Sequence, residues 1–163
     1  MGIPVATAAP RAAQHKTKAK AQPIESPAEV LSKNKTPASS AKIRTLVSWA
    51  MANCKKSSTG KCFRYVKLAL QKSGLVNKYL SGESAKNAGP GLLAQGFKKL
   101  SVKNPYKAPI GAVLVYSGGA HGHIEIRTSK GFVSDYFSPA ARTGASESGV
   151  GRGRKLIGVY FKS

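Results

Sequence analysis

The sequence is poor in cysteine and histidine. Its 163 residues include two cysteines and three histidines. A disulfide-dense scaffold needs several cysteine pairs, and a zinc finger needs four cysteine or histidine ligands at set spacings. The composition excludes both of these classes.

Long hydrophobic runs are also lacking. No stretch approaches the length of about 18 consecutive apolar residues that a membrane-spanning helix needs. The segment Met1–Arg11 has neither the charged start nor the continuous apolar stretch of a signal peptide. We therefore expect no classical signal peptide, and a protein that stays inside, leaves by a route without a cleaved signal, or has been trimmed.

Acidic residues are scarce. Six Asp and Glu face 27 Lys and Arg, which gives a formal net charge of +21 at pH 7. Such an excess excludes an average cytosolic housekeeping enzyme and indicates a polyanionic partner: nucleic acid, anionic lipid or a bacterial envelope polymer. The apolar content of 41% is near that of globular proteins, so the whole chain is not a disordered basic tail.

Composition divides the chain near residue 40. Residues 1–40 are rich in Ala, Pro, Ser, Thr and Lys and contain no aromatic residue, which predicts a disordered basic tail. Residues 41–163 carry the apolar patterns of a folded domain. Because 20 basic and four acidic residues lie in 43–163, most of the excess charge is expected on the domain.

The folded region begins with helical patterns and continues with strand patterns. Apolar residues at positions 43, 46, 47 and 50 predict a helix, which Ser39 or Ser40 would cap. A second helix is predicted to begin at Cys62 and to stop at Gly74, with a short helical turn near 92–95. Helices followed by antiparallel strands predict an α+β fold. The predicted strands cover 112–116, 123–127, 132–137 and 156–161.

Cys62 stands at the first turn of the second predicted helix. There the unpaired N–H groups and the positive end of the helix dipole stabilise a thiolate, the nucleophilic form of cysteine. The same N–H groups can contribute to an oxyanion hole. A small buried hydrophobic residue is the alternative interpretation, and position alone does not decide between them.

His123 strengthens the catalytic interpretation. The alternation over 123–127 places Ile124 and Ile126 on the core side and His123 on the opposite face. A strand histidine facing a cysteine at a helix N-terminus forms a Cys–His pair.

A third polar group is expected to orient the imidazole. If Ser129–Gly131 is the hairpin loop, Asp135 lies opposite Glu125 and on the face of His123, whereas a two-residue loop turns Asp135 away. Glu125 is the other candidate. Instead of orienting His123, it could form an ion pair with Arg127. The residues alone leave this choice open.

Four further residues are candidates for lesser roles. Tyr116, His121 and Ser134 lie near the predicted cleft, so we expect them to contact substrate. Cys54 lies eight residues before Cys62 and is either a free structural thiol or the partner of Cys62 in a disulfide that switches the enzyme off.

Two short motifs resemble those of CHAP domains (cysteine, histidine-dependent amidohydrolases/peptidases). Gly60–Val66 resembles their nucleophile motif, and Pro109–Tyr116 followed by Gly122–Ile124 resembles their histidine motif. The resemblance covers about residues 43–163 and extends to the wider NlpC/P60 group. It implies a papain-like fold in which N-terminal helices pack on an antiparallel β-sheet.

The resemblance implies cleavage of amide bonds in the stem peptides or cross-bridges of peptidoglycan, by an endopeptidase or an N-acetylmuramoyl-L-alanine amidase. Cys62 would form an acyl-enzyme, and His123 would take the thiol proton and pass it to the leaving amine. Asp135 follows the histidine strand, where NlpC/P60 members carry their third polar residue, which favours it over Glu125. Calcium-binding CHAP endolysins have a carboxylate cluster that is lacking here, so we expect no metal and no cofactor.

The expected partners are bacterial peptidoglycan and the anionic cell envelope, with no specific nucleic acid, and the protein is expected to be a monomer. It would act on the bacterial cell wall or periplasm after release or secretion, as a bacteriolytic endolysin, an injected antibacterial effector or a trimmed secreted enzyme. The alternative is a nucleic-acid-binding or membrane-disrupting cationic protein without catalysis. The sequence contains no helix-turn-helix, RNA-recognition or zinc module that would favour nucleic acid.

Overall fold

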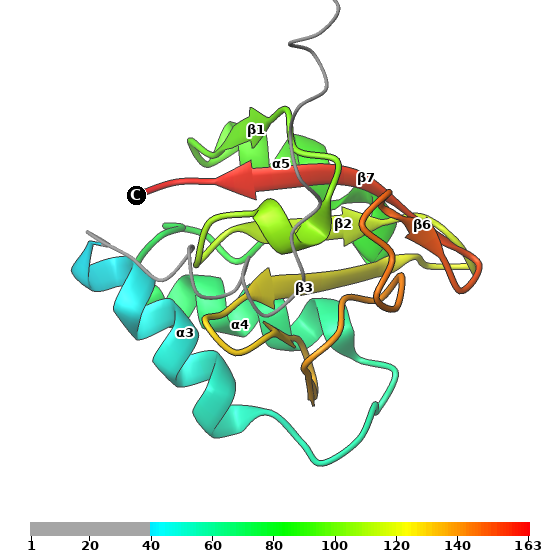
Figure 1. Ribbon diagram of the computed structural model, residues 1–163. Coiled ribbons are helices and arrows are strands. Elements are labelled where there is room, and N and C mark those ends of the chain that lie inside the picture. The colour runs from blue at the N-terminus through cyan, green and yellow to red at the C-terminus, as the bar shows by residue number, and fades with distance from the viewer. Residues whose placement is uncertain (1–39) are drawn as a thin grey trace, which may run out of the picture.

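A computed structural model describes residues 40–163 (Figure 1). The tail predicted over 1–40 lies outside the described residues except for Ser40. Two helices come first, α3 (Ala41–Asn53) and α4 (Cys62–Ser73), and they pack against each other. Within the described part of the chain, no helix is long and apolar enough to cross a membrane.

Both long helices begin and end as their sequences predict. The Ser40 side chain accepts a hydrogen bond from the Ile43 N–H at 3.3 Å and caps α3. Gly74 ends α4 in the left-handed conformation, with φ of 78°, and its N–H donates to the Gln71 carbonyl at 3.1 Å. These ends fix where α4 starts, and therefore where Cys62 lies.

Three short helical elements follow, of which the sequence predicted only part of one. They are η1 (Ala85–Asn87), α5 (Ala88–Ala94) and η2 (Pro105–Lys107). The predicted turn near 92–95 is the end of α5, whose beginning is hidden by Gly89 and Pro90. Pro90 lies in the first turn, where no N–H is needed, and Gly89 makes room for the Tyr160 hydroxyl against the helix.

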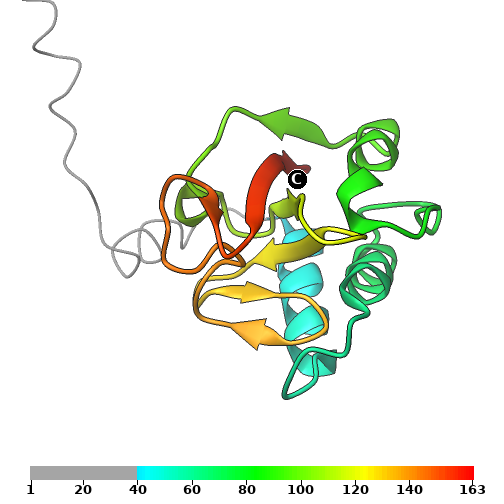
Figure 2. The ribbon, with the colours of Figure 1, turned by 90° about the vertical axis from the view of Figure 1, so that its right-hand side faces the viewer.

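The strands form an antiparallel sheet of order β1-β7-β2-β3-β4-β5, with β6 paired to β7. Helix α4 packs along β3, and in Figure 2 the strands β3 to β5 lie in front of α3. The arrangement confirms the predicted α+β class with helices on an antiparallel sheet. The strands are β1 (Lys98–Leu100), β2 (Val113–Tyr116), β3 (His123–Arg127), β4 (Phe132–Val133), β5 (Phe137–Ser138), β6 (Val150–Gly151) and β7 (Arg154–Phe161).

The hairpin after β3 has a different register from the predicted one. Arg127 pairs with Phe132, so the loop holds four residues and Thr128 belongs to it. The Thr128 hydroxyl explains the longer loop, because it accepts hydrogen bonds from the N–H groups of Lys130 at 3.1 Å and Gly131 at 3.0 Å. The shift by one residue removes the predicted pairing of Glu125 with Asp135.

The predicted strand over 132–137 is interrupted as well. A turn separates β4 from β5, with the Ser134 N–H donating to the Tyr136 carbonyl at 2.9 Å. Asp135 lies at the middle of this turn. Its backbone therefore does not follow the alternation of a strand, which the prediction for its side chain assumed.

Apolar residues pack on both faces of the sheet. Ile124 and Ile126 join the cluster formed with α3 and α4, as predicted, while Tyr116 joins a second cluster on the opposite face. His123 pairs with Tyr116 across β2 and β3 and shares that second face. The predicted half-buried strand is buried on both sides, since every residue of β3 is buried.

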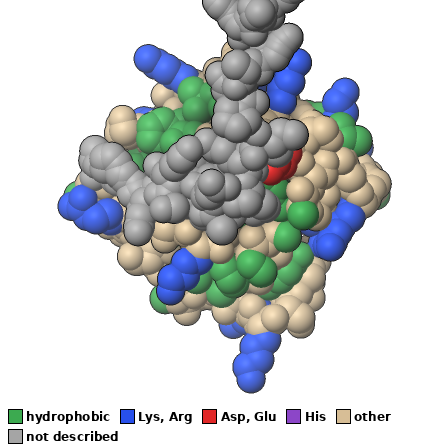
Figure 3. All heavy atoms as spheres, in the orientation of Figure 1, with side chains coloured by type: hydrophobic (Ala, Val, Ile, Leu, Met, Phe, Trp, Pro, Cys, Tyr) green, Lys and Arg blue, Asp and Glu red, His purple; other side chains and the backbone are tan. Residues whose placement is uncertain are grey.

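The surface of the domain is strongly basic, because two of the four carboxylates in 43–163 are internal. Glu125 is 3% exposed and Asp135 is 0% exposed. Figure 3 shows Lys and Arg side chains distributed around the visible face, with little acidic surface between them. The excess charge is thus displayed outward, where anionic polymers can meet it.

Candidate active site

Cys62 begins α4, as predicted, and is half-buried. It lies in the wall of a groove of about 460 Å³, which is lined by residues 60–64, Lys67, Tyr79, Gly82, Glu83, Ala85 and His121. No side chain caps this end of α4. The first N–H groups of any α-helix have no intrahelical acceptor. Because no side-chain cap occupies them here, they can stabilise negative charge at the thiol.

His123 lies next to Cys62, and the thiol and the imidazole each shift the pKa of the other. The other side of the ring is engaged by a carboxylate, because Nε2 lies 3.1 Å from Oε1 of Glu125. Nδ1 is thus the nitrogen left to pair with the sulfur. The side chains come from two elements, the start of α4 and the start of β3, which pack against each other.

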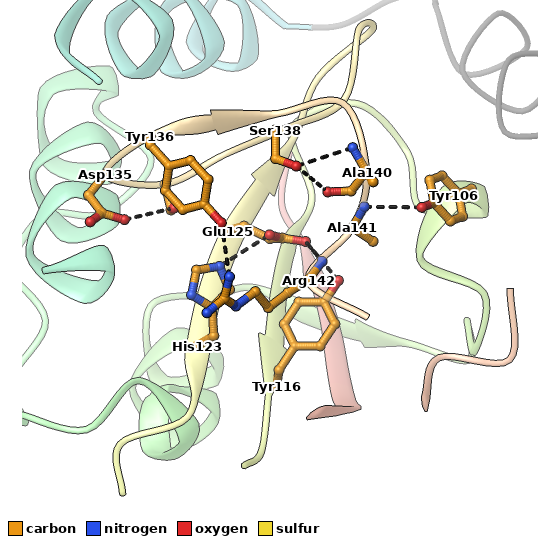
Figure 4. Close-up of polar contacts among 11 residues, drawn as sticks. Tyr106, Tyr116, His123, Glu125, Asp135, Tyr136, Ser138, Ala140, Ala141 and Arg142 are labelled. Atoms are coloured by element: carbon orange, nitrogen blue, oxygen red, sulfur yellow. Dashed lines mark hydrogen bonds and ion pairs between the residues drawn. The ribbon is translucent and has the colours of Figure 1, made fainter. Parts of the chain in front are cut away.

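Glu125 is held by three partners (Figure 4). Besides His123, its carboxylate accepts hydrogen bonds from the Tyr116 hydroxyl at 2.8 Å and from the Arg142 N–H at 3.3 Å. Arg142 is placed in turn by its guanidinium, which donates to the Tyr136 hydroxyl at 3.0 Å. A buried carboxylate with these donors is fixed in position and compensated for lost hydration.

Thiol and imidazole shift each other toward the charged forms. Burial raises the pKa of the Cys62 thiol, but the hydrogen bond and charge of His123, helped by the Ile124 N–H, lower it further than burial raises it. Burial lowers the pKa of His123, but hydrogen bonds to Cys62 and Glu125 raise it overall to about 9. Both shifts favour a thiolate–imidazolium pair near neutral pH.

Asp135 does not meet the imidazole, which corrects the predicted placement. Its Oδ2 accepts from the N–H of Thr59 at 2.5 Å and from the Thr59 hydroxyl at 2.8 Å, and its Oδ1 accepts from the Ser134 hydroxyl at 3.0 Å. The changed hairpin register and the turn at Asp135 turn its carboxylate away from the cluster around Glu125 (Figure 4).

The hydrogen bonds of Asp135 instead tie down the loop that leads to the nucleophile. The Lys61 N–H lies 3.4 Å from Oδ2, and the Lys55 N–H donates to the backbone carbonyl of Asp135 at 2.6 Å. Burial raises the pKa of the Asp135 carboxyl, but the hydrogen bonds from Thr59 and Ser134 lower it overall. An ionised Asp135 thus holds the residues directly before Cys62.

Of the three residues expected to contact substrate, only His121 faces the groove. It is exposed, lines the groove beside Cys62, and its Nδ1 lies 2.9 Å from the Ser84 hydroxyl. Tyr116 is 0% exposed and Ser134 is 4% exposed. Tyr116 instead donates a hydrogen bond to Glu125, and Ser134 donates one to Asp135.

Arg127 and Cys54 have other partners in the structure than Glu125 and Cys62. The Arg127 guanidinium donates to backbone carbonyls, to that of Tyr106 at 3.0 Å and to that of Thr128, rather than pairing with Glu125. Cys54 and Cys62 are both free thiols, and Cys54 donates to the Met51 carbonyl at 3.3 Å.

Several residues at the site are not predictable from local sequence patterns. Thr59 and the Arg142 N–H act through contacts far apart in the chain, for which no local pattern exists. The position of Lys67 has a sequence signal, since Lys67 lies one helical turn after Phe63 and therefore on the same face of α4. Within residues 40–163, no group of three or more His, Cys, Asp or Glu side chains could hold a metal ion.

Comparison with known proteins finds relatives by structure and none by sequence. No protein-family model and no curated protein matches the sequence. Similar chains occur in the native and selenomethionine crystal structures of the type VI effector–immunity complex Tae3–Tai3 from Ralstonia pickettii.

The likeness spans whole chains of that complex. In the native structure the identity is 26%, the TM-score is 0.57, and the match covers 76% of this chain and 100% of the other. In the selenomethionine structure the identity is 25%, the TM-score is 0.56, and the match covers 72% and 98%. The likeness supports the α+β domain and is not specific to CHAP or NlpC/P60 proteins.

Proposed function

We propose that this protein is an antibacterial effector that hydrolyses amide bonds of peptidoglycan with Cys62, His123 and Glu125 as a catalytic triad. The observation that carries the proposal is the thiol–imidazole–carboxylate series at the start of α4, with the thiol in the wall of a groove. Oriented nucleophile, base and carboxylate in this order are the arrangement of a cysteine peptidase or amidase.

Acylation uses the charged pair directly. The Cys62 thiolate attacks the amide carbonyl carbon and forms a tetrahedral intermediate. The His123 imidazolium donates its proton to the amine nitrogen as the C–N bond breaks, which leaves a thioester on Cys62 and a neutral imidazole. The raised pKa of His123, about 9, keeps this proton available at neutral pH.

Deacylation reverses the proton's path. The neutral His123 takes a proton from water as the water oxygen attacks the thioester carbonyl. The C–S bond then breaks, the thiolate of Cys62 leaves, and the free carboxylic product departs. The proton taken from water restores the imidazolium.

Glu125 orients the imidazole throughout the cycle. By accepting the hydrogen bond of Nε2, it keeps Nδ1 directed at the sulfur and stabilises the imidazolium. We assign the developing oxyanion to the N–H groups of Cys62 and Phe63 in the first turn of α4, where no side-chain cap competes. His121, exposed in the same groove, is proposed to contact substrate.

The setting is inferred from the structural likeness and the charge. Similarity to chains of a type VI effector–immunity complex supports injection into other bacteria over release as an endolysin. The basic surface supports retention on the anionic envelope of the target cell. By the same likeness, we propose a dedicated immunity protein as the partner in the producing cell. A papain-like relation to CHAP and NlpC/P60 enzymes is part of this proposal, supported by the order of cysteine on a helix and histidine on a strand.

The test is digestion of purified peptidoglycan by the full chain and by Cys62→Ala, with Cys54→Ala as the matched control. We expect soluble fragments from the wild type and from Cys54→Ala, and none from Cys62→Ala. Mass spectrometry of the fragments separates cleavage at the sugar–peptide junction from cleavage within the peptide. Undiminished release by a folded Cys62→Ala protein would falsify the proposal.

A further inference from the structure

Lys67 is a buried cation in the wall of the groove that contains Cys62. It is 7% exposed, which is unusual for lysine. It lies on α4, five residues after Cys62, and both residues line the same groove. At about 1.5 Å of rise per residue, the two positions are separated by about 8 Å along the helix axis.

The ammonium group is held in one position. It donates a hydrogen bond to the Gly82 carbonyl at 2.5 Å. It lies 4.1 Å from the centroid of the Phe63 ring and 5.1 Å from that of Tyr79. Two aromatic faces and one carbonyl orient the cation without neutralising it.

Lys67 forms no ion pair within residues 40–163, although the carboxylate of Glu83 belongs to the same groove. An ammonium group has three N–H donors, and the Gly82 carbonyl is the one hydrogen-bond acceptor that this part of the chain supplies. Burial lowers the pKa of Lys67, and the charge of Glu83 raises it, although Glu83 does not come within ion-pair distance. A fixed, partly desolvated cation with free donors is suited to bind an anion.

We propose that Lys67 forms a carboxylate-binding subsite of the groove, which positions a free carboxylate of the peptide substrate beside the amide that Cys62 attacks. The proposal rests on the proposed function and adds that the groove selects peptides with a free carboxylate near the scissile amide. Peptide chains of peptidoglycan carry free carboxylates that amidation neutralises, so the subsite would distinguish these two states. The competing explanation is that Lys67 only ties α4 to the segment around Gly82.

The first test does not require peptidoglycan hydrolysis. The rate of alkylation of Cys62 is measured with anionic iodoacetate and neutral iodoacetamide, with the modified peptide identified by mass spectrometry so that Cys54 does not interfere. The ratio of the two rates cancels changes in the amount of thiolate. We expect Lys67→Met to lower the iodoacetate-to-iodoacetamide ratio by about two-fold or more, because loss of a nearby cation weakens the attraction of the anionic reagent.

Two further variants distinguish anion binding by the Lys67 charge from a purely structural link between α4 and the segment around Gly82. Lys72→Met removes an exposed lysine near the other end of α4 and is expected to leave the ratio unchanged. Lys67→Arg keeps the charge while changing the hydrogen-bond geometry, and is expected to keep the ratio within about two-fold of the wild type. An unchanged ratio in folded Lys67→Met, or an equal loss in Lys67→Arg, would overturn the subsite.

The second test uses paired peptide substrates that differ only in carboxylate against carboxamide. We expect the wild type to prefer the carboxylate, mainly through KM, and Lys67→Met to lose that preference. Retained preference in Lys67→Met would overturn the subsite even if hydrolysis is confirmed. Absence of hydrolysis by the wild type would contradict the proposed function, while the alkylation ratio would still decide whether Lys67 attracts an anion.

Discussion

Two buried carboxylates near the proposed catalytic pair, Glu125 on β3 and Asp135 in the turn between β4 and β5, have different hydrogen-bond partners. Glu125 contacts His123, whereas Asp135 contacts Thr59 and the loop that precedes Cys62. In the proposed mechanism, Glu125 orients the base, and Asp135 holds the backbone that carries the nucleophile. Burial and charge alone do not distinguish such roles; the hydrogen-bond partners do.

Among substitutions that test the two carboxylates, Glu125→Gln is expected to have the largest effect. Its amide can donate as well as accept, so Nδ1 of His123 is no longer held toward the sulfur. We predict that kcat falls by about 10³-fold or more, as for amidation of the carboxylate in comparable triads. The measurement is release of soluble fragments under saturating peptidoglycan, with the fold checked by circular dichroism.

Asp135→Asn is the matched control for that prediction, because it makes the same chemical change in the other carboxylate. We predict a decrease in kcat of less than about tenfold, since the imidazole keeps its partner. A larger loss in Asp135→Asn than in Glu125→Gln would reverse the two assigned roles.

The pH dependence of kcat/KM provides a second way to separate the two residues. The active thiolate–imidazolium pair exists above the lowered pKa of Cys62 and below the pKa of His123, about 9. Since Glu125 raises the pKa of His123, Glu125→Gln should move the alkaline limb to lower pH. An alkaline limb unchanged by this substitution would contradict the contact between Glu125 and His123.

Asp135→Asn should instead affect stability. Two hydrogen bonds from Thr59 to an ionised group would weaken, and hydrogen bonds to charged groups contribute about 1.5–3 kcal/mol. We predict that the free energy of unfolding falls by about 2 kcal/mol at pH 7, as measured by urea denaturation.

The sign of the pH effect on this loss follows from the lowered pKa of Asp135. The stabilisation is fully present above the pKa of the unfolded carboxyl, about 3.9, and is lost as pH falls through the folded value. The difference between wild type and Asp135→Asn should therefore shrink below about pH 4. A difference that is constant from pH 7 to pH 3 would contradict an ionised, hydrogen-bonded Asp135.

Much of this arrangement is predictable from sequence, because short-range patterns determine it. Helical periodicity and Gly74 place Cys62 at the start of α4, and period-two alternation places His123 at the start of β3. Two long, regular elements thus bring the central pair together.

The third residue is not predictable in this way. Its identity depends on whether Thr128 belongs to a strand or to the loop, and one residue of register reverses the face of Asp135. The hydroxyl of Thr128 decides this by capping two N–H groups, which no periodicity reveals. Residues two apart on a strand are separated by about 6.6 Å along it, which by itself disfavours contact between Glu125 and His123, yet the two side chains meet at 3.1 Å.

Tyr116→Phe should have the smallest effect. It removes one of the three hydrogen bonds to Glu125 without emptying the core. We predict a decrease in kcat of a few-fold, corresponding to about 0.5–1.5 kcal/mol. A loss as large as that of Glu125→Gln would mean that Tyr116 acts on the reaction directly.

The most direct test is mass spectrometry of purified peptidoglycan after parallel digestion by wild type, Cys62→Ala, Glu125→Gln and Asp135→Asn. A Cys62–His123–Glu125 triad predicts fragments with new amine and carboxyl ends from the wild type and Asp135→Asn, strongly reduced amounts from Glu125→Gln, and none from Cys62→Ala. Fragments from Cys62→Ala at the wild-type level would contradict it.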